Sequence, residues 1–456
     1  MFRISNPFCV SLAAVLLTTG CRSDPGEGPA GSEVGRSPTA QMDIVDALRR
    51  DQEAVRHPAD GGGSVRFASQ PEPIMAGGSG TWSFVYQAGP RGIAEDAWLF
   101  FQAPPFWGWS TPQVVAPEAP GYTEVSTDAA SLNLDSATID QQLLAIQIKQ
   151  RSLQEGEEIR LVFGAGPAGA AADRYAERRS CFYFAVDGDG DGVRSLVGEP
   201  LCTEVTAGPA AQLVLTLPST SRPGESAELT VAALDGVGNR VSDWTGSVEL
   251  AAPEWVEVAS TILFEDQHAG ARRVPIGTPS SGTFTVAAST ADGLRGVSNP
   301  MKIEPTARRV LWGDLHGHSA LTDGTGTPKD YFRYARDVAG LDVSALTDHD
   351  HWGMQPLAIH PELWEEIRRE TELFHRPGQF VTLLGFEWTS WIHGHRHVLY
   401  FSDQGEILSS IDQDFESPLQ LWDALRGTDA LTFAHHSAGG PIATNWELPP
   451  DPELEP

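Results

Sequence analysis

The stretch Val310-Leu311-Trp312-Gly313-Asp314-Leu315-His316-Gly317-His318 decides how the C-terminal third of this 456-residue chain folds. It begins with an apolar run typical of a short strand and ends with two histidines separated by one residue. On an extended segment, histidines at that spacing point to the same side, so both rings can bind one cation. The stretch therefore predicts a metal site at the end of a strand.

Beyond residue 307, apolar strands alternate with amphipathic helices, as is typical of an α/β barrel. Two helices are expected to begin with a cap followed by proline, at Thr327-Pro328 and Ser417-Pro418. The strands are expected at residues 341–347, 380–386, 398–401 and 431–434, and the helices at 327–338, 361–375 and 417–425. Barrels need roughly 250 residues, more than this segment holds, so we expect an incomplete barrel over residues 306–456.

Histidines are concentrated in this last segment, where eleven of the 13 in the chain lie between His316 and His436. Most follow an expected strand directly, and barrel enzymes place their active sites at the C-terminal ends of strands. Carboxylates accompany them at Asp323, Asp348 and Glu387. Glu387 ends a very apolar strand, where a buried carboxylate needs a cation or a hydrogen-bond partner. We therefore expect a metal centre rather than scattered surface histidines.

The ordered motifs Gly313–Ser319, Asp323-Gly324, Leu346–Asp350 and Glu387 resemble the polymerase and histidinol phosphatase (PHP) superfamily. They are most similar to an uncharacterised bacterial PHP-like family in which β-sandwiches precede the metal domain. The resemblance implies a distorted seven-stranded α/β barrel that holds two or three Zn, Mn or Fe ions and hydrolyses phosphoesters. The final Asp-x-His pair of that superfamily has no counterpart here, which also favours a truncated domain.

By this resemblance the metal ligands fall into three groups. The first is His316, His318 and Glu387; the second is Asp323 and His349; the third is His397 and His435, with His395 a rival to His397 and His436 a weaker rival to His435. The segment contains no cysteine, so the ligand set is nitrogen and oxygen, which suits Zn, Mn or Fe. Asp348 is a candidate for orienting a ligand or moving a proton, and Arg396 a candidate phosphate clamp; a loop cap and a surface charge are the simpler alternatives.

Two modules with period-two apolar patterns precede the metal segment. Residues 76–206 and 207–305 each contain short alternating runs, such as Trp82, Phe84 and Tyr86, separated by Gly and Pro turns. This predicts two all-β, immunoglobulin-like sandwiches. The aromatic stretch Phe106-Trp107-Gly108-Trp109 is either a sugar platform or part of the packed core.

Two features of the first module concern disulfide and cation chemistry. Cys181 and Cys202 are an even pair in an exported chain, which predicts one disulfide. Between them, Asp187, Asp189 and Asp191 alternate with glycines, as in the first half of a calcium loop. The twelfth position of that loop is Gly198 rather than glutamate. Structural calcium and a plain acidic turn both remain open.

The N-terminus is a targeting segment. Residues 1–20 resemble a bacterial lipoprotein signal peptide, and Cys21 would be lipidated; ordinary secretion is the alternative. Residues 21–75 are expected to form a disordered tether with a short helix near Met42–His57. A formal net charge of −30 disfavours nucleic-acid binding. We therefore expect a protein of the cell envelope, attached to the membrane through Cys21.

Three functions are compatible with this organisation. The first is an exported metal-dependent phosphoesterase acting on small-molecule or polymeric phosphoesters. The second is a non-catalytic surface protein that binds glycans or serves in adhesion. The third is an amidohydrolase, which also begins with His-x-His but would need a lysine after a middle strand. No lysine follows Lys329.

Overall fold

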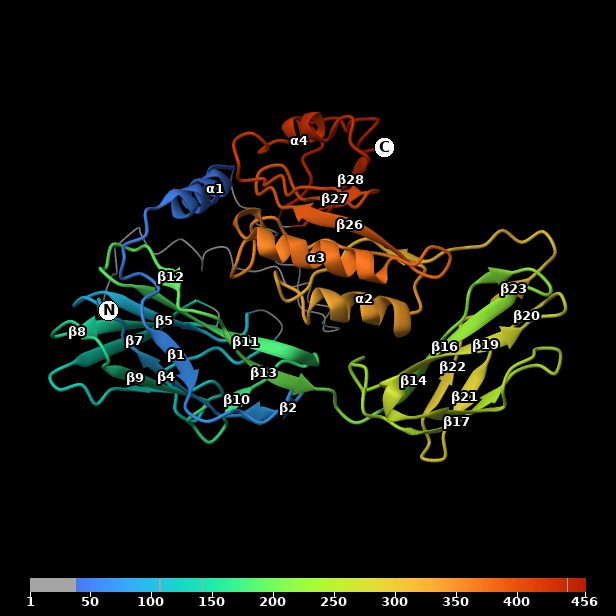
Figure 1. The fold of residues 1–456 in the computed structure, drawn as a ribbon, viewed down its shortest axis with the longest axis horizontal. Helices are drawn as coiled ribbons and strands as arrows, with labels where there is room; N and C mark the ends of the chain where they lie inside the picture. The colour runs from blue at the N-terminus through green and yellow to red at the C-terminus, as the bar shows by residue number, and fades with distance from the viewer. Residues whose placement is uncertain (1–37, 106–107, 141, 441) are drawn as a thin grey trace, which may run out of the picture.

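The computed structural model describes residues 38–105, 108–140, 142–440 and 442–456. The expected signal peptide and the lipidation site Cys21 lie outside these residues. Figure 1 shows two β-sandwiches, one at each side of the molecule, with the C-terminal domain between and above them. Across the described ranges, we find no helix that is both long and apolar enough to cross a membrane.

The first sandwich packs two main sheets around aromatic side chains, including Phe84, Phe101 and Phe182. One sheet has the order β1 (Ser64–Phe67), β4 (Trp82–Gln87), β9 (Glu158–Phe163) and β6 (Thr123–Ser126). The other has the order β2 (Ile74–Met75), β13 (Leu201–Thr206), β11 (Glu177–Asp187), β5 (Trp98–Gln102), β8 (Leu143–Lys149) and β7 (Asn133–Asp140), with β12 (Ser195–Leu196) beside β11. A small pair joins β3 (Ser79–Gly80) and β10 (Ala170–Ala171). Strand β1 lies inside the segment expected to be a tether.

Cys181 and Cys202, the pair for which a disulfide was expected, lie opposite each other on β11 and β13. The structure joins them in a disulfide bond. The bond crosslinks neighbouring strands at one place in the larger sheet of the first sandwich.

The second sandwich has its own core, which includes Leu229, Val231 and Val286. One sheet has the order β14 (Gln212–Thr216), β16 (Ser226–Leu234) and β19 (Ala271–Gly277). A second has the order β15 (Thr220–Ser221), β23 (Met301–Ile303) and β20 (Gly282–Phe284). A third has the order β18 (Thr261–Phe264), β17 (Gly246–Ala251), β21 (Ala287–Ser289) and β22 (Arg295–Val297). A 3-10 turn spans Asp266–His268. Two β-sandwiches are thus present, and strands outnumber helices in the part of the chain that is described.

The C-terminal domain is built on a five-stranded sheet. Its order is β24 (Gly313–Asp314), β25 (Val343–Leu346), β26 (Val381–Trp388), β27 (Arg396–Tyr400) and β28 (Ala430–Ala434). The helices are α2 (Pro328–Asp337), α3 (Pro361–Phe374) and α4 (Pro418–Leu425), with a 3-10 turn at Leu357–Ile359. Thr327 and Ser417 cap α2 and α4 through capping boxes, each followed by proline.

The expected α/β barrel does not describe this sheet. Strands β24, β25 and β26 are parallel, but β27 is antiparallel to both β26 and β28. The reason is the short segment 389–395 between β26 and β27, because a parallel crossover needs a dozen or more residues. The described residues therefore form an open mixed sheet with β24 and β28 at its edges.

Helix α1 (Pro38–Glu53) precedes both sandwiches in sequence but packs against the C-terminal domain (Figure 1). Ile44 and Val45 bury their side chains in one apolar cluster with Trp352 and Trp391. Arg49 adds an ion pair of 2.5 Å with Glu416. Helix α1, which belongs to the segment expected to be a tether, is thus ordered against the domain that carries the histidines.

Candidate metal centre

The topology of the C-terminal sheet explains why its polar side chains meet. Strands β24, β25, β26 and β28 run in the same direction, so their C-terminal ends share one edge. The antiparallel β27 brings its N-terminal end to that same edge. The residues delivered there are His316 and His318 after β24, His349 after β25, Glu387 near the end of β26, His395 and His397 at the start of β27, and His435 after β28. Loops and strand ends far apart in sequence therefore converge on Glu387.

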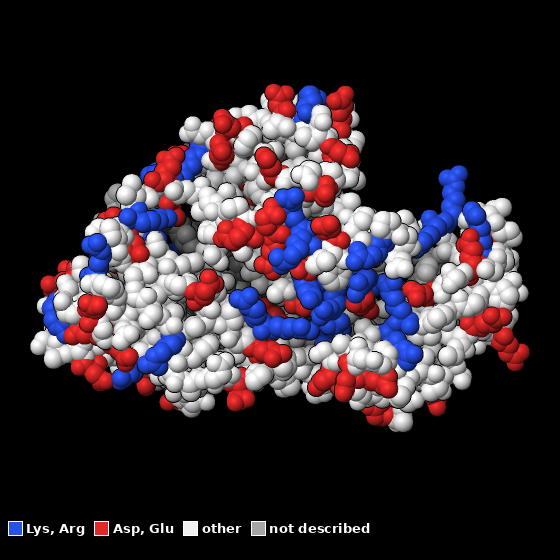
Figure 2. Space-filling view, in the orientation of Figure 1, with Lys and Arg blue, Asp and Glu red and all other residues white. Residues whose placement is uncertain are grey.

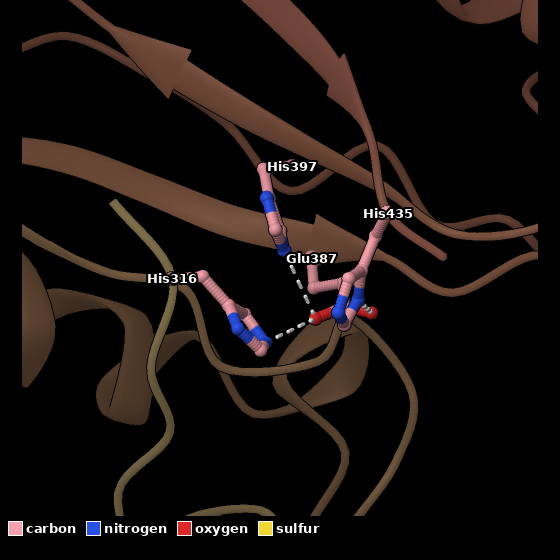
Figure 3. Close-up of side chains that lie close together, drawn as sticks. All are labelled: His316, Glu387, His397 and His435. Carbon is pink, nitrogen blue, oxygen red and sulfur yellow. Dashed lines mark hydrogen bonds and ion pairs between the residues drawn. The ribbon is translucent and has the colours of Figure 1, made fainter. Parts of the chain in front are cut away.

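Glu387 has no exposed surface and lies at the centre of the cluster. His316, Glu387, His397 and His435 each offer one ligand atom within 4.8 Å of the others (Figure 3). Oε2 of Glu387 is 3.5 Å from Nε2 of His316 and 3.4 Å from Nε2 of His397. Oε1 is 2.8 Å from Nδ1 of His435. We call these four residues the first ligand group.

A second ligand group shares Glu387 and consists of His318, His349 and Glu387. Nε2 of His318 lies 3.3 Å from Oε2 of Glu387. Asp323 closes this group from the other side, with Oδ1 3.6 Å from Nδ1 of His318 and 3.4 Å from Nε2 of His349. The glutamate therefore lies between two sets of imidazoles, as a bridging carboxylate does between two cations.

The grouping differs from the one inferred from the sequence. His316 and His318 were assigned to one ion, but His316 groups with His397 and His435 whereas His318 groups with His349. The two rings remain close, with their Nε2 atoms 2.9 Å apart. A third set, His395, His435 and His436, lies beside the first group. Both proposed rivals, His395 and His436, are therefore part of the cluster.

The electrostatics of the cluster favour ionised carboxylates. Burial raises the pKa of Glu387, but the surrounding imidazoles, His349 foremost, outweigh it and hold that pKa well below its usual value. Burial opposes protonation of His318, yet Asp323 and Glu387 raise its pKa to about 9. His397 behaves oppositely, because burial lowers its pKa to about 4. The carboxylates of Glu387 and Asp323 thus carry charge at neutral pH, Glu387 fully buried and Asp323 partly exposed.

Several buried atoms in the cluster lack a hydrogen-bond partner among the described residues. They include Oε2 of Glu387, Nδ1 of His318, Nε2 of His395 and Nε2 of His397. Leaving such atoms unsatisfied costs about 1–3 kcal/mol each, more where charge is involved. Divalent cations would satisfy them together. The nitrogen and oxygen donors fit Zn, Mn or Fe, and His316, His318, His349, His397, His435, Asp323 and Glu387 would hold the ions.

A threonine that the sequence did not single out fixes one of the ligand rings. The hydroxyl of Thr389 donates to the carbonyl of Glu387, so it accepts from Nδ1 of His349 at 2.6 Å. With its proton on Nδ1, a neutral His349 would present the lone pair of Nε2 on the side of Asp323, which is the form that binds a metal. Thr389 lies two residues after Glu387, just beyond the end of β26. This position was the only feature of the sequence that could have pointed to it.

Asp348 and Asp350 flank His349 and point away from it into separate hydrogen-bond networks. Asp348 accepts from Ser319 and Thr322, in the loop that carries His318. Asp350 accepts from Ser409, Ser410 and the backbone of Thr389. Both carboxylates are fully buried. Asp348 therefore positions the loop of His318, and its contacts do not match the proton-transfer role considered for it.

Arg396 does not face the metal centre. Side chains alternate along β27, so Arg396 points to the opposite face from His395 and His397. Its guanidinium is buried, bonds Glu455 at 2.8 Å, and lies 5.5 Å from the ring of Trp422. The expected phosphate clamp is thus wrong, because this arginine is part of a buried ion pair behind the sheet.

The other sequence candidates lie in the first sandwich. Asp187, Asp189 and Asp191 come together as a set with suitable spacing for a cation, and Asp187 also bonds the backbone of Gly190 and Gly192. Burial raises the pKa of Asp187 to about 6. In the aromatic stretch, Trp109 is buried and donates to Ser180, which makes it a core residue; Phe106 and Trp107 lie outside the described residues.

The chain matches the model of DUF3604, a protein family of unknown function, over residues 339–439. This match contains His349, Glu387, His397 and His435, and therefore most of the ligand cluster. A curated relative, an uncharacterized protein of Chlamydia pneumoniae, is 25% identical over 263 residues, which cover 54% of this chain and 41% of the relative. The chain thus spans less than half the length of that relative.

Solved structures share only a loose likeness with the chain. The D0-D1 domain of intimin is 10% identical with a TM-score of 0.18, covering 52% of this chain and 97% of that one. InvD of Yersinia pseudotuberculosis is 13% identical with a TM-score of 0.22, covering 54% and 61%. A β-glycosidase from Bacteroides vulgatus is 9% identical with a TM-score of 0.20, covering 53% and 24%. Scores this low carry no functional argument.

These findings correct the resemblance to the PHP superfamily. The DUF3604 match over residues 339–439 contains two of the motifs, Leu346–Asp350 and Glu387, whereas Gly313–Ser319 and Asp323-Gly324 precede it, and the comparisons give the PHP superfamily no support. The motifs misled because His-x-His, isolated carboxylates and a strand-end glutamate are what any cluster of nitrogen and oxygen ligands at a sheet edge requires. The residues themselves support a cluster of nitrogen and oxygen donors. They do not support the assignment to the PHP superfamily.

Proposed function

We propose that the C-terminal domain is a metal-dependent hydrolase that uses two cations and acts on phosphoesters. The observation that carries the proposal is the fully buried Glu387, whose carboxylate is shared by two groups of imidazoles. Two divalent ions held there would supply a nucleophile from water near neutral pH and offset charge on a phosphoryl group. A third ion beside His395, His435 and His436 is part of the same proposal.

The protein's own residues have distinct tasks in this proposal. Glu387 would contribute to holding both ions, and Asp323 would supply the second charged ligand. Thr389 would orient the ring of His349, and Asp348 holds the loop of His318. Among the described residues, the buried arginine is Arg396, which points away from the centre, so charge on the substrate would be offset by the cations.

We further propose that this activity is located outside the cytoplasm. The disulfide between Cys181 and Cys202 supports an oxidising compartment. Lipid attachment at Cys21 and calcium in the loop of Asp187, Asp189 and Asp191 remain parts of the proposal. The formal charge of −30 continues to disfavour a nucleic-acid partner.

A metal-exchange experiment tests the proposal. Protein stripped with EDTA and reloaded with Zn, Mn or Fe is assayed for phosphate release on a panel of phosphomonoesters and phosphodiesters. We expect turnover that depends on the metal and is lost in Glu387→Gln. A loaded protein that binds two ions and hydrolyses no member of the panel would contradict phosphoester hydrolysis.

A further inference from the structure

A cavity of about 370 Å³ lies where the first sandwich, α1 and the C-terminal domain meet. Its C-terminal wall is the segment 351–360, which follows β25 at the same sheet edge as the metal centre. In sheets with parallel strands, ligands bind outside the carboxyl ends of those strands. A larger cavity next to the second sandwich includes Gly340 and Gln379, which precede β25 and β26 at the opposite edge. The smaller cavity is therefore the one placed to communicate with the metals.

The sandwich wall of this cavity is apolar on a face that would otherwise meet solvent. Phe101, Phe182 and Phe184 point into the core, so the alternate residues Phe100, Tyr183 and Ala185 point outward. Phe100 and Ala185 are nevertheless buried and form a small apolar cluster of their own. This outer face therefore presents an aromatic surface toward the C-terminal domain.

Trp352 connects the cavity to the metal centre. Its ring stacks on His349 with centroids 5.0 Å apart, and the same residue lines the cavity. Trp352 is 8% exposed, and its indole N–H has no hydrogen-bond partner among the described residues. A buried donor of this kind is costly unless a ligand offers an acceptor. Trp352 therefore lies between the cavity and the candidate metal ligand His349, with its indole nitrogen buried.

The charge at the cavity favours an anion despite the acidity of the whole chain. Arg56 and Arg194 line it together with Asp51, which pairs with Arg56 at 3.3 Å. Arg194 also lies over the ring of Phe100, 4.5 Å from its centroid. The whole chain has 61 acidic against 31 basic residues, so a lining with two arginines and one aspartate is a local departure. On the face drawn in Figure 2, acidic and basic side chains are interspersed.

We propose that this cavity binds an aryl group that carries a negative charge, so that aryl phosphoesters are the substrate class of the metal centre. The inference rests on the proposed function. Phe100 and Tyr183 would contact the ring, and Arg194 would offset the charge of the ligand. The substrate then lies between the two domains, which gives the first sandwich a part in substrate choice.

The test measures binding without metals, so it does not depend on hydrolysis. Metal-free protein is titrated with phenyl phosphate and with ethyl phosphate by calorimetry. We expect phenyl phosphate to bind about tenfold or more tightly, because only its ring contacts aromatic side chains. Equal affinities, or no binding of phenyl phosphate, would overturn the proposal.

Variants locate the site. Ala185→Phe fills the cavity and should remove the preference for phenyl phosphate, whereas Ala287→Phe, at an exposed position of the second sandwich, should keep it. If Ala185→Phe fails to fold, Tyr183→Ala replaces it and should weaken phenyl phosphate alone. Retention of the full preference in the folded cavity variant would contradict the assignment. A further outcome is that metal-loaded protein hydrolyses both esters at equal kcat/KM while the metal-free protein shows no binding preference. That result would contradict the aryl-binding role of the cavity but would leave the proposed hydrolase activity intact.

Discussion

Replacing Glu387 by glutamine should abolish most of the stabilisation that metal ions give the C-terminal domain. The substitution keeps the shape of a side chain with no exposed surface but removes the charge shared by the two ligand groups. Oε2 of Glu387 lies 3.3 Å from Nε2 of His318 and 3.4 Å from Nε2 of His397, so one change affects both groups.

The size of the effect follows from linkage. An ion present at 100 times its Kd stabilises the folded state by about 2.7 kcal/mol, so two ions give about 5 kcal/mol. Changing a residue behind a ligand already lowers affinity about 10–100-fold, and loss of a charged ligand should exceed that. At the same metal concentration each ion would then contribute about 0.4 kcal/mol or less. At about 2–4 °C per kcal/mol, the metal-induced rise in Tm falls from about 10 °C or more to about 3 °C or less.

Differential scanning calorimetry of EDTA-stripped protein, with and without added Mn²⁺, measures this difference. Glu370→Gln is the matched control, because Glu370 is a buried glutamate on α3 that belongs to neither ligand group. Its metal-induced shift should equal that of the wild type. The reasoning is refuted if Glu387→Gln keeps the full shift, or if Glu370→Gln loses as much of it.

Three further predictions concern supporting residues. Thr389→Val should lower metal affinity about 10–100-fold, as measured by titration calorimetry. Thr203→Val, at a buried threonine of β13, should leave the affinity unchanged. Equal affinities of the two variants would show that Thr389 does not support metal binding. Burial raises the pKa of Asp173 to about 7. As the pH rises, Asp173 therefore loses its proton in the unfolded state before it does so in the folded state. The free energy of unfolding should fall by up to about 4 kcal/mol between about pH 4 and about pH 7. Asp173→Asn should flatten that fall in chemical denaturation, and an unchanged pH profile would argue against it. Asp350→Asn should destabilise the C-terminal domain by about 1–3 kcal/mol, because the amide cannot accept all the hydrogen bonds that the carboxylate accepts; an unchanged urea midpoint would contradict this.

The sequence singled out the histidines and the glutamate that the structure brings together, because the signal of each is local. His-x-His after an apolar run, and a glutamate ending another, are each visible within a few residues. Their convergence followed from the rule that parallel strands share one C-terminal edge. Their division into groups did not follow, since it depends on where β27 and β28 place His397 and His435.

Long-range packing explains what the sequence missed. Arg396 was a candidate phosphate clamp with a surface charge as the alternative, but strand alternation sends it to the buried side with Glu455. Helix α1 was assigned to a tether because the residues that cover it, such as Trp352 and Ile411, are hundreds of positions away. The α/β barrel was expected because strands and helices alternate along the sequence. The antiparallel pairing of β26 with β27 makes the sheet mixed instead.

The central claim is that Glu387 lies between two bound cations. Crystals of the metal-loaded protein, measured at the absorption edge of the bound metal, test it most directly. The account predicts two anomalous peaks on either side of the Glu387 carboxylate, one beside His316, His397 and His435 and the other beside His318, His349 and Asp323. Loaded crystals with no peak at Glu387, or with a single peak remote from it, would contradict the account.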